Sequence, residues 1–483
     1  MWMCWCALFM TAWVLSACDA GEGRAVPHVL TWGRCSAPGL APGFEGLTLP
    51  RELECAWLER PLDVADPSAG HGRVRLAVSR LPARGRRLGT LVLVSGGPGQ
   101  PGLSSPLALS GADLEHLRES FDFVGYDPRG VGRSRPAIRC VAPLEGAEDR
   151  EGAERALRRY VAGCVAGSGE ALLRHVDTQS AVSDLESLRH ALGEPKLTAV
   201  GYSYGTQVVG QYALRYPQRV RALVLDGVVD LSEPNHVALI SQEQGYSRSL
   251  ERFATYCRSQ PGCPFPADGK RAVEHYRQLL VRAETPGLDS AALDRSRIEA
   301  VVTQWLLERN QWEALRLALA ALDRGDAAPM RQLAASLHGF VDDAALTAIT
   351  CADSATPDMP PTQRSRQLRR LQDTSVSRLP EAEPMPDICD AWPFPGTWRP
   401  SMPVPSPRLP QLLFVAHEYD PTTPHANARR MASAFLSPLL TRQGDGHTLV
   451  LHDVDACIDE RVASYLLEPD RYIADAWCPA SER

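Results

Sequence analysis

Lysine is almost missing from this chain of 483 residues. Only Lys196 and Lys270 occur among the 51 basic residues, and the formal net charge is −7 at pH 7. Proteins that bind nucleic acids need a basic face that neutralises phosphates. The composition therefore argues against a nucleic-acid partner. The preference for arginine over lysine is more typical of a GC-rich genome than of a binding role.

Several motifs that bind metals or nucleotides are incomplete. No Cys-x-x-Cys pair occurs, so the scattered cysteines do not indicate a zinc site. His417 and Glu418 begin a zinc-protease motif, but Pro421 stands where the second histidine is required. Leu103 occupies the lysine position of a phosphate-binding loop, and residues 130–132 lack the third glycine that a dinucleotide site needs. The sequence predicts neither a metal nor a cofactor.

Charge is absent from residues 1–17, MWMCWCALFMTAWVLSA. This apolar run is short for a membrane-spanning helix but suits a signal peptide. It ends in LSAC (15–18), which resembles a bacterial lipobox, in which the cysteine is lipidated. We therefore expect export from a bacterial cell, with lipidation at Cys18 as the only attachment to a membrane. A plain secretory signal is the alternative, because the leader has no basic residue.

Ten cysteines follow the leader, and an even number in an exported protein suggests disulfides. The order of the cysteines favours consecutive pairing, as an expectation and not a deduction. The expected pairs are Cys35–Cys55, Cys140–Cys164, Cys257–Cys263, Cys351–Cys389 and Cys457–Cys478.

Hydrophobic runs bounded by turn residues predict a parallel sheet. Residues 58–66 and 73–81 alternate as an opening pair of strands, and near-continuous apolar runs follow. Continuous runs are typical of strands that are covered on both faces. Helical patterns lie between these runs, so the sequence predicts a doubly wound α/β fold. The apolar runs occupy residues 90–99, 121–130, 197–205, 222–227 and 411–420.

The alternation of strands and helices breaks between Asp230 and about Pro410. This stretch is mostly helical, most clearly over residues 296–325, and it is too long for a loop. We interpret it as an inserted helical lid; a separately folding domain is the alternative. The expected division is a first part of the core over residues 18–230, the lid over 231–410 and the C-terminal part of the core over 411–483.

Residues 201–206, GYSYGT, place a serine between two glycines directly after the apolar run LTAV. Glycines on both sides suit a turn so tight that neighbouring side chains would collide. A strand, this turn and a helix would expose the Ser203 hydroxyl above the sheet edge as a nucleophile. An ordinary strand-to-helix turn is the alternative, because the motif also arises by chance.

A serine nucleophile needs a base and an orienting carboxylate, which in such a fold follow in the order Ser, Asp, His. Asp420 ends the run QLLFVAHEYD, and His447 follows the glycine turn of GDGHT. Their order and strand-end positions predict Asp420 as the orienting acid and His447 as the base. Asp445 and Asp453 are weaker candidates for the acid, because both follow the expected position.

Attack on a carbonyl also needs backbone N–H groups that stabilise the negative oxygen. One donor is expected from Tyr204, directly after the serine, and the other from the loop SGGPG (95–99).

Seven ordered motifs together resemble the α/β-hydrolase family of proline iminopeptidases, most closely its exported tripeptidyl-aminopeptidase branch. The resemblance runs from about Cys55 to Cys478. The motifs are GGPG (96–99), GYDPRGVGRS (125–134), GYSYGT (201–206), LVLDGVVD (223–230), ITCADS (349–354), EYDPTTP (418–424) and GDGHT (444–448).

The resemblance implies a serine exopeptidase that releases short peptides from a free N-terminus. Transferred to the matching positions, it implies Ser203 as nucleophile, Asp420 as orienting acid and His447 as base. It also implies that Gly97 and Tyr204 form the oxyanion hole. The chain departs from the family at residues 100–101, Gln-Pro, where a small residue and serine are common.

An aminopeptidase must recognise a cationic α-amine, and an amine that leaves water needs a carboxylate partner. We expect this carboxylate in the lid or directly before it, first among Asp230, Glu233 and Glu243. Two other functions stay open. One is an esterase or amide hydrolase of small metabolites with the same triad, and the other is a binding protein with an inactive hydrolase fold.

Overall fold

The computed structural model describes most of the chain, but not its first 29 residues. The leader predicted over residues 1–17, the lipidation site Cys18 and the candidate acid Asp453 lie outside the described part. No helix within that part is long and apolar enough to cross a membrane. The described ranges are residues 30–35, 49–68, 70–109, 113–144, 149–266, 271–283, 293–337, 343–356, 359–378, 384–452 and 455–480.

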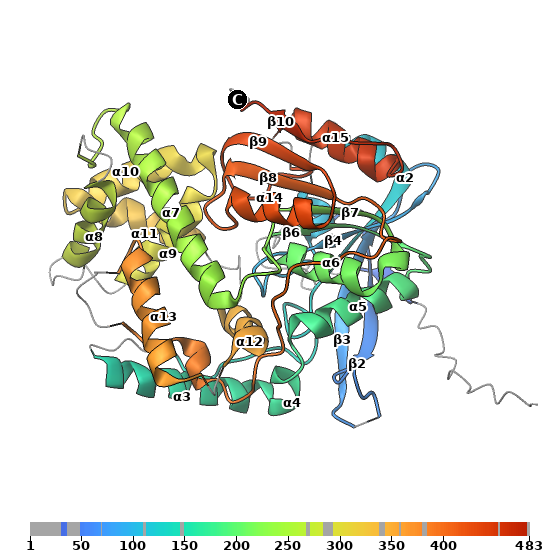
Figure 1. Cartoon of the computed structure of the whole chain (residues 1–483), viewed down its shortest axis with the longest axis horizontal. Helices are drawn as coiled ribbons and strands as arrows, with labels where there is room; N and C mark the ends of the chain where they lie inside the picture. The colour runs from blue at the N-terminus through green and yellow to red at the C-terminus, as the bar shows by residue number, and fades with distance from the viewer. Residues whose placement is uncertain are drawn as a thin grey trace, which may run out of the picture.

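A ten-stranded sheet runs through the described part of the chain (Figure 1), in the order β1-β2-β3-β5-β4-β6-β7-β8-β9-β10. The pairings from β1 to β5 are antiparallel, and those from β5 through β4 to β10 are parallel. The strands are β1 (Gly33–Arg34), β2 (Glu54–Pro61), β3 (Arg73–Leu81), β4 (Gly89–Val94), β5 (Phe121–Tyr126), β6 (Leu197–Tyr202), β7 (Val220–Asp226), β8 (Leu413–Tyr419), β9 (Leu439–Asp445) and β10 (Ala476–Cys478).

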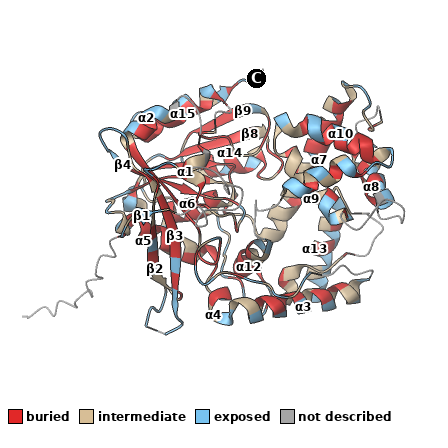
Figure 2. Cartoon of the chain, turned by 180° about the vertical axis from the view of Figure 1, so that it is seen from behind, coloured by how far each residue is buried: buried red, intermediate tan, exposed pale blue. Residues whose placement is uncertain are grey.

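Neighbouring residues of the central strands are buried on opposite faces of the sheet. In β4, Val92 and Val94 belong to the apolar cluster on one face, and Leu91 and Leu93 to the cluster on the other. Side chains alternate along a strand, so a strand covered on both faces needs an apolar residue at every position. Figure 2 shows these strands buried. The predicted fold class, a mostly parallel doubly wound α/β sheet, is confirmed.

Helices cover both faces of this sheet. The cluster on one face includes residues of α3, α4, α5, α6, α12 and α14, and the cluster on the other includes residues of α2 and α15. The helices outside the region between β7 and β8 are α1 (Ser105–Ala108), α2 (Asp113–Ser120), α3 (Arg150–Ser168), α4 (Glu170–Leu173), α5 (Thr178–Ala191), α6 (Tyr204–Arg215), the 3-10 turn η2 (Pro217–Arg219), α14 (His425–Ala434) and α15 (Ala456–Leu467).

The segment between β7 and β8 is helical and lies beside the sheet (Figure 1). Helices α7 to α11 pack around an apolar cluster of their own that includes Phe253 and Trp312, whereas Ala345 of α12 and Cys389 of η6 join a cluster of the sheet. The lid over residues 231–410 stays a prediction. The elements are α7 (Asn235–Arg258), α8 (Ala272–Ala283), α9 (Arg295–Leu306), η5 (Arg309–Gln311), α10 (Trp312–Asp323), α11 (Ala328–Ser336), α12 (Asp343–Ser354), α13 (Pro361–Thr374) and η6 (Ile388–Ala391).

The segment over residues 296–325 is helical, as expected, but it consists of two α-helices joined by a 3-10 turn. Helix α9 ends at Leu306, the backbone is extended at Glu308, and α10 begins at Trp312. Glu308 pairs with Gly446 as an isolated antiparallel bridge. Residues 307–311, where the helix is interrupted, contain no glycine or proline. We attribute the interruption to the contact of Glu308 with Gly446, in a distant part of the chain.

The five predicted disulfides are confirmed. Two of them join elements that matter below: Cys351 of α12 is bonded to Cys389 of η6, and Cys457 of α15 is bonded to Cys478 of β10. The other three are Cys35–Cys55, Cys140–Cys164 and Cys257–Cys263.

Candidate active site

Ser203 lies at the turn between β6 and α6 and has φ of 52° and ψ of −121°. A positive φ is unfavourable for a residue with a side chain and persists only where its surroundings hold it. The Ser203 N–H donates to the Asp226 carbonyl at 2.8 Å. Its carbonyl accepts from the Thr206 amide at 2.8 Å and from the Thr206 hydroxyl at 2.6 Å. Backbone bonds on both sides therefore hold the turn.

The two glycines of GYSYGT are required by the close approach of backbone segments. A Cβ at Gly201 would lie 2.7 Å from the Gly205 carbonyl oxygen. A Cβ at Gly205 would lie 2.2 Å from the carbonyl oxygen of Val94 at the end of β4. Both distances are shorter than a carbon and an oxygen tolerate, so the tight turn expected from the sequence is present.

Asp420 and His447 meet at the ends of β8 and β9. His447 Nδ1 lies 2.8 Å from Asp420 Oδ2. The amides of Thr422 and Thr423 donate to Asp420 Oδ1, each at 2.8 Å, and the Thr423 hydroxyl donates to Oδ2 at 3.0 Å. An ionised carboxylate in this position keeps the proton on Nδ1 and leaves Nε2 free to accept another.

Two other carboxylates near His447 bind other groups, although one oxygen of Asp226, Oδ1, is buried without a hydrogen-bond partner among the described residues. Both oxygens of Asp445 bind the guanidinium of Arg252 from α7, at 2.5 and 2.8 Å. Asp226 Oδ2 accepts from the amides of Leu449 and Val450, at 2.6 and 2.8 Å. Burial raises the pKa of Asp226 to about 6, although these amides favour its charged form. Asp226 lies in the motif LVLDGVVD, but the sequence does not reveal that it holds the backbone after His447.

Ser203 and His447 line one cavity of about 550 Å³. Its volume is within the usual range for sites that bind small ligands. The loop after β4 contributes Gly97 and Gln100 to the wall, and the helical region contributes Tyr246, Trp305 and Glu308, among others. The predicted nucleophile and base therefore face a common space beneath the helical region.

One predicted oxyanion donor, Tyr204, directly follows Ser203, and the other, Gly97, lines the same cavity. Tyr204 is the first residue of α6, and the first N–H groups of a helix have no acceptor within it. Gly97 lines the cavity with φ of 100°, a conformation that favours glycine. The neighbouring amide of Gly96 donates to Gln100 Oε1 at 3.2 Å, whereas no described residue accepts from the Gly97 amide. Gln100, where the chain departs from the family, thus holds this loop.

Glu308 is a carboxylate at the cavity that the sequence reasoning missed. It is half-buried, and no described donor forms a hydrogen bond to its carboxylate. Burial raises the pKa of Glu308, and nearby positive charge on His447 and Arg442 partly offsets this effect. Among the described residues that line the cavity there is no lysine or arginine. This arrangement leaves a carboxylate that forms no hydrogen bond or ion pair with a described residue.

The three lid acids predicted to bind a substrate amine are engaged elsewhere. Asp230 and Glu233 pair with Arg430, and Glu243 accepts from the Val376 amide at 3.2 Å. None of the three is among the described residues that line the cavity. The geometry therefore does not support the prediction for these acids.

The pKa of His447 is raised above its ordinary value. Burial disfavours the imidazolium, but attraction to Asp420, the hydrogen bond to it, and the charges of Asp226 and Glu308 outweigh that effect. His417, which begins the incomplete zinc motif, is buried next to Gly446, and burial lowers its pKa to about 3. His417 is therefore neutral, and His447 is the better base.

Two groups of described residues outside the cavity bring possible metal ligands together, and one of them is Asp455 with the disulfide-bonded Cys457 and Cys478. In the other group, the ligand atoms of Asp63, His71 and His175 lie within 4.8 Å of one another near the β2–β3 hairpin. None of these residues lines the cavity that holds Ser203. Both groups therefore lie outside that cavity.

Comparisons with known proteins show the family to which this chain is similar. The family model described as the alpha/beta hydrolase fold matches residues 89–453. Serine protease Hip1 of Mycobacterium tuberculosis is 33% identical, over 97% of this chain and 95% of that protein. Carboxylesterase B of the same organism is 32% identical, over 86% and 85%. Tripeptidyl aminopeptidase of Streptomyces coelicolor is 28% identical, over 94% and 87%.

Proposed function

This chain belongs to the α/β-hydrolase family, and we propose that it is an exported serine aminopeptidase of the di- or tripeptidyl type. In this proposal Ser203, His447 and Asp420 form the catalytic triad. The Gly97 and Tyr204 amides form the oxyanion hole.

The proposed reaction proceeds through an acyl-enzyme. Ser203 Oγ attacks the carbonyl carbon of the scissile bond while His447 Nε2 takes its proton, and Asp420 stabilises the imidazolium. The amides of Gly97 and Tyr204 bind the negative oxygen of the tetrahedral intermediate. His447 then gives the proton to the leaving amine. A water molecule, deprotonated by His447, attacks the ester and releases the N-terminal peptide.

The observation that carries the choice of an aminopeptidase is the carboxylate of Glu308. A carboxylate that is half-buried without a hydrogen bond from a described residue is costly unless a ligand neutralises it. The α-ammonium group of a peptide would supply the charge and up to three donors. Because Glu308 and Ser203 line the same cavity, a bound N-terminus would place a nearby peptide bond at the nucleophile.

The relatives support two substrate classes. The names serine protease and tripeptidyl aminopeptidase favour peptides, whereas carboxylesterase favours esters, which the same triad would cleave. An ester substrate does not need a carboxylate for its recognition. Glu308 therefore favours the peptidase, and an esterase of small metabolites is the second candidate.

Free-amine tripeptide amides should be cleaved well and their N-acetylated forms poorly. Glu308→Gln should lower kcat/KM for the free-amine substrate about 10- to 100-fold, the value of a charge-assisted hydrogen bond. The same variant should change kcat/KM for an acetylated peptide or a short acyl ester far less. Chromogenic substrates measure all three rates.

Glu243→Gln is the matched control for this experiment, since Glu243 lies in the same helical region but outside the described cavity wall. It should keep the wild-type preference for a free amine. Equal rates for blocked and free peptides in the wild type would turn the assignment towards the esterase.

The ordinary pKa of a histidine side chain is about 6.5. In the pH profile of kcat/KM, the midpoint of the acid limb should lie above this value. Only neutral His447 can accept the serine proton, and its raised pKa means that it becomes protonated at a higher pH than usual. Glu308→Gln removes a negative charge that stabilises the imidazolium, so the midpoint should move to lower pH. A short acyl ester is the substrate for the profile. Asp445→Asn should leave the midpoint unchanged, because Arg252 neutralises Asp445.

Export is proposed from the leader and from the disulfides. Five disulfides in the described residues fit an oxidising compartment outside the cytosol. Lipidation at Cys18 stays part of the proposal. Mass spectrometry of the mature N-terminus would distinguish a lipoprotein from a secreted protein.

A further inference from the structure

Helix α12 lies directly against the loop that carries Gly97. A Cβ at Gly99 would lie 2.8 Å from the backbone nitrogen of Leu346 and 3.0 Å from the Cβ of Ala345, both in α12. The loop backbone is therefore packed on the helix without room for a side chain. A displacement of α12 would therefore displace the loop that carries Gly97, the first proposed oxyanion donor.

The other end of α12 reaches the second oxyanion donor through hydrogen bonds. Asp353 Oδ1 accepts from the Thr178 amide at 2.8 Å, and Oδ2 accepts from the Thr178 hydroxyl at 2.5 Å. The Thr178 hydroxyl lies 2.8 Å from the Tyr204 hydroxyl. With Asp353 ionised, Tyr204 donates to Thr178, which donates to Asp353. The side chain of Tyr204 is thus anchored at its far end, while its amide lies beside Ser203.

Asp353 is expected to lower the stability of the folded protein at this position. It is 7% exposed, and no described cation pairs with it. Burial raises the pKa of Asp353 to about 7. Burying a carboxylate without a cation reduces stability even when hydrogen bonds satisfy its oxygens. The triad does not use Asp353.

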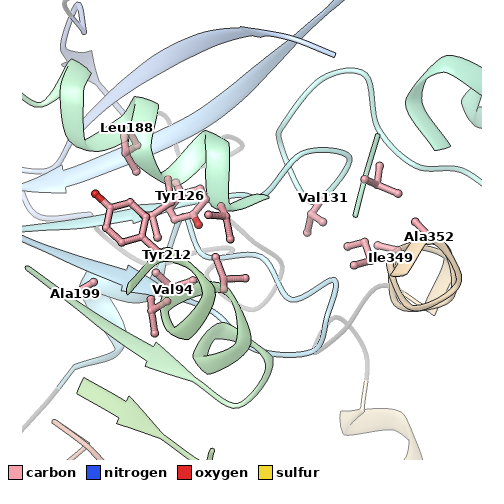
Figure 3. Packing of buried hydrophobic residues seen from close by; sticks show 14 of the residues in the cluster. Val94, Tyr126, Val131, Leu188, Ala199, Tyr212, Ile349 and Ala352 are labelled. Atoms are coloured by element: carbon pink, nitrogen blue, oxygen red, sulfur yellow. The ribbon is translucent and has the colours of Figure 1, made fainter. Parts of the chain in front are cut away.

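Helix α12 is itself held firmly. Ile349 and Ala352 pack in the same apolar cluster as Val131, and Figure 3 shows these three side chains close together. The disulfide Cys351–Cys389 ties the middle of the helix to η6. The Trp398 amide donates to the Asp353 carbonyl at 2.9 Å. A helix that packs against the Gly97 loop at Gly99 and reaches Tyr204 through Thr178 can fix the distance between the two donors.

We propose that α12 positions the oxyanion hole, with Asp353 acting through Thr178 and the Tyr204 hydroxyl on the Tyr204 amide. Asp353 is a positioning residue that does not touch the substrate. Oxyanion donors work only within about 2.7–3.1 Å of the developing charge, and a misplacement of about 1 Å can reduce the rate 100-fold. The proposal rests on the serine-hydrolase part of the proposed function and not on the class of substrate.

Asp353→Ala should slow the reaction of Ser203 with a fluorophosphonate about tenfold or more, because phosphonylation also develops charge at the oxyanion hole. With an ester or amide substrate, kcat should fall by a similar factor while KM changes less than about threefold. Asp353→Asn should retain most of the labelling rate. Its amide oxygen still accepts from the Thr178 amide, and its NH₂ group donates to the Thr178 hydroxyl, which can then donate to Tyr204. The Gln207 amide nitrogen, 3.5 Å from Asp353 Oδ2, must then exchange places with the Gln207 amide oxygen, which can accept from the new NH₂ group.

Tyr204→Phe tests whether Asp353 acts through Tyr204. This variant keeps the backbone amide but lacks the hydroxyl, so it should reproduce part of the loss. The double variant Tyr204→Phe/Asp353→Ala should be no slower than Asp353→Ala alone, since both changes break one chain of hydrogen bonds. Additive losses, or wild-type labelling by Asp353→Ala, would overturn the proposal.

A pair of disulfide variants keeps the test informative if Asp353→Ala folds poorly. Cys351→Ala/Cys389→Ala releases α12, whereas Cys257→Ala/Cys263→Ala removes a disulfide at the end of α7. Only the first pair should slow labelling of the folded protein, as judged by circular dichroism. Equal labelling by the two pairs contradicts the proposal. A wild type that is labelled at Ser203 but cleaves no peptide refutes only the aminopeptidase assignment, and one that is not labelled refutes both proposals.

Discussion

Ser203→Ala should lower kcat about 10⁴- to 10⁶-fold and leave the fold intact, because the nucleophile is lost and little else changes. The turn is held by backbone groups of Ser203, and no described residue forms a hydrogen bond to its hydroxyl. Alanine at φ of 52° is about as strained as serine. Turnover of a chromogenic substrate, covalent labelling by a fluorophosphonate and circular dichroism are the measurements. Adding His447→Ala should reduce kcat no further, since the triad acts as a unit.

Ser187→Ala is the matched control, because Ser187 lies on α5 and its hydroxyl bonds only the Ser183 carbonyl among the described residues. It should retain wild-type turnover and labelling. Peptide mapping of the labelled wild type should place the phosphonate on Ser203. A label on another serine, or more than about 1% of the wild-type kcat in Ser203→Ala, would refute the assignment of the nucleophile.

The positions of Ser203, Asp420 and His447 could be predicted because each follows a strand of one parallel sheet. The carboxyl ends of parallel strands meet at the same edge, so residues far apart in the sequence converge there. The order of the three residues and the glycines around Ser203 then limit the alternatives. The tight turn at Ser203 and the Asp420–His447 contact are in the structure. The catalytic roles still await the variants.

Glu308 could not be predicted, because nothing local interrupts the helical pattern around it. The residues from 296 to 325 have good helix propensity, but the helix is interrupted where Glu308 pairs with Gly446. That pairing spans more than a hundred residues and brings the carboxylate to the turn of His447. Tertiary contact overrides local propensity here. The lid acids nearer to β7 were the more obvious candidates, but Arg430 and the Val376 amide hold them.

Asp226 and Asp353 show a second reason why the role of a residue could not be predicted from the sequence. Both lie in motifs that the sequence presents, LVLDGVVD and ITCADS, yet a motif does not reveal what its carboxylate binds. Asp226 takes two backbone amides after His447, and Asp353 takes the amide and hydroxyl of Thr178. Each is buried and acts on another residue, so its role depends on packing between segments that lie far apart in the chain.

Asp420→Asn should lower kcat about 10³- to 10⁴-fold, because it reverses the tautomer of His447. The amides of Thr422 and Thr423 both donate to Oδ1, so the asparagine oxygen will take that position and its NH₂ group will face His447. His447 Nδ1 must then accept a hydrogen bond, and the proton moves to Nε2. A histidine with Nε2 protonated cannot take the proton of Ser203. Turnover and fluorophosphonate labelling should therefore fall together.

Asp445→Asn and Asp226→Asn decide which acid serves His447. Asp445 is neutralised by Arg252, so its variant should keep kcat within about threefold of the wild type. Asp226 Oδ2 accepts two backbone amides, and its Oδ1 is buried without a hydrogen-bond partner in the described part of the chain. No hydrogen bond joins Asp226 to His447, so Asp226→Asn should lower kcat less than Asp420→Asn does. Full activity in Asp420→Asn together with an inactive Asp226→Asn would transfer the orienting role to Asp226, because only one of the two can hold the proton on Nδ1.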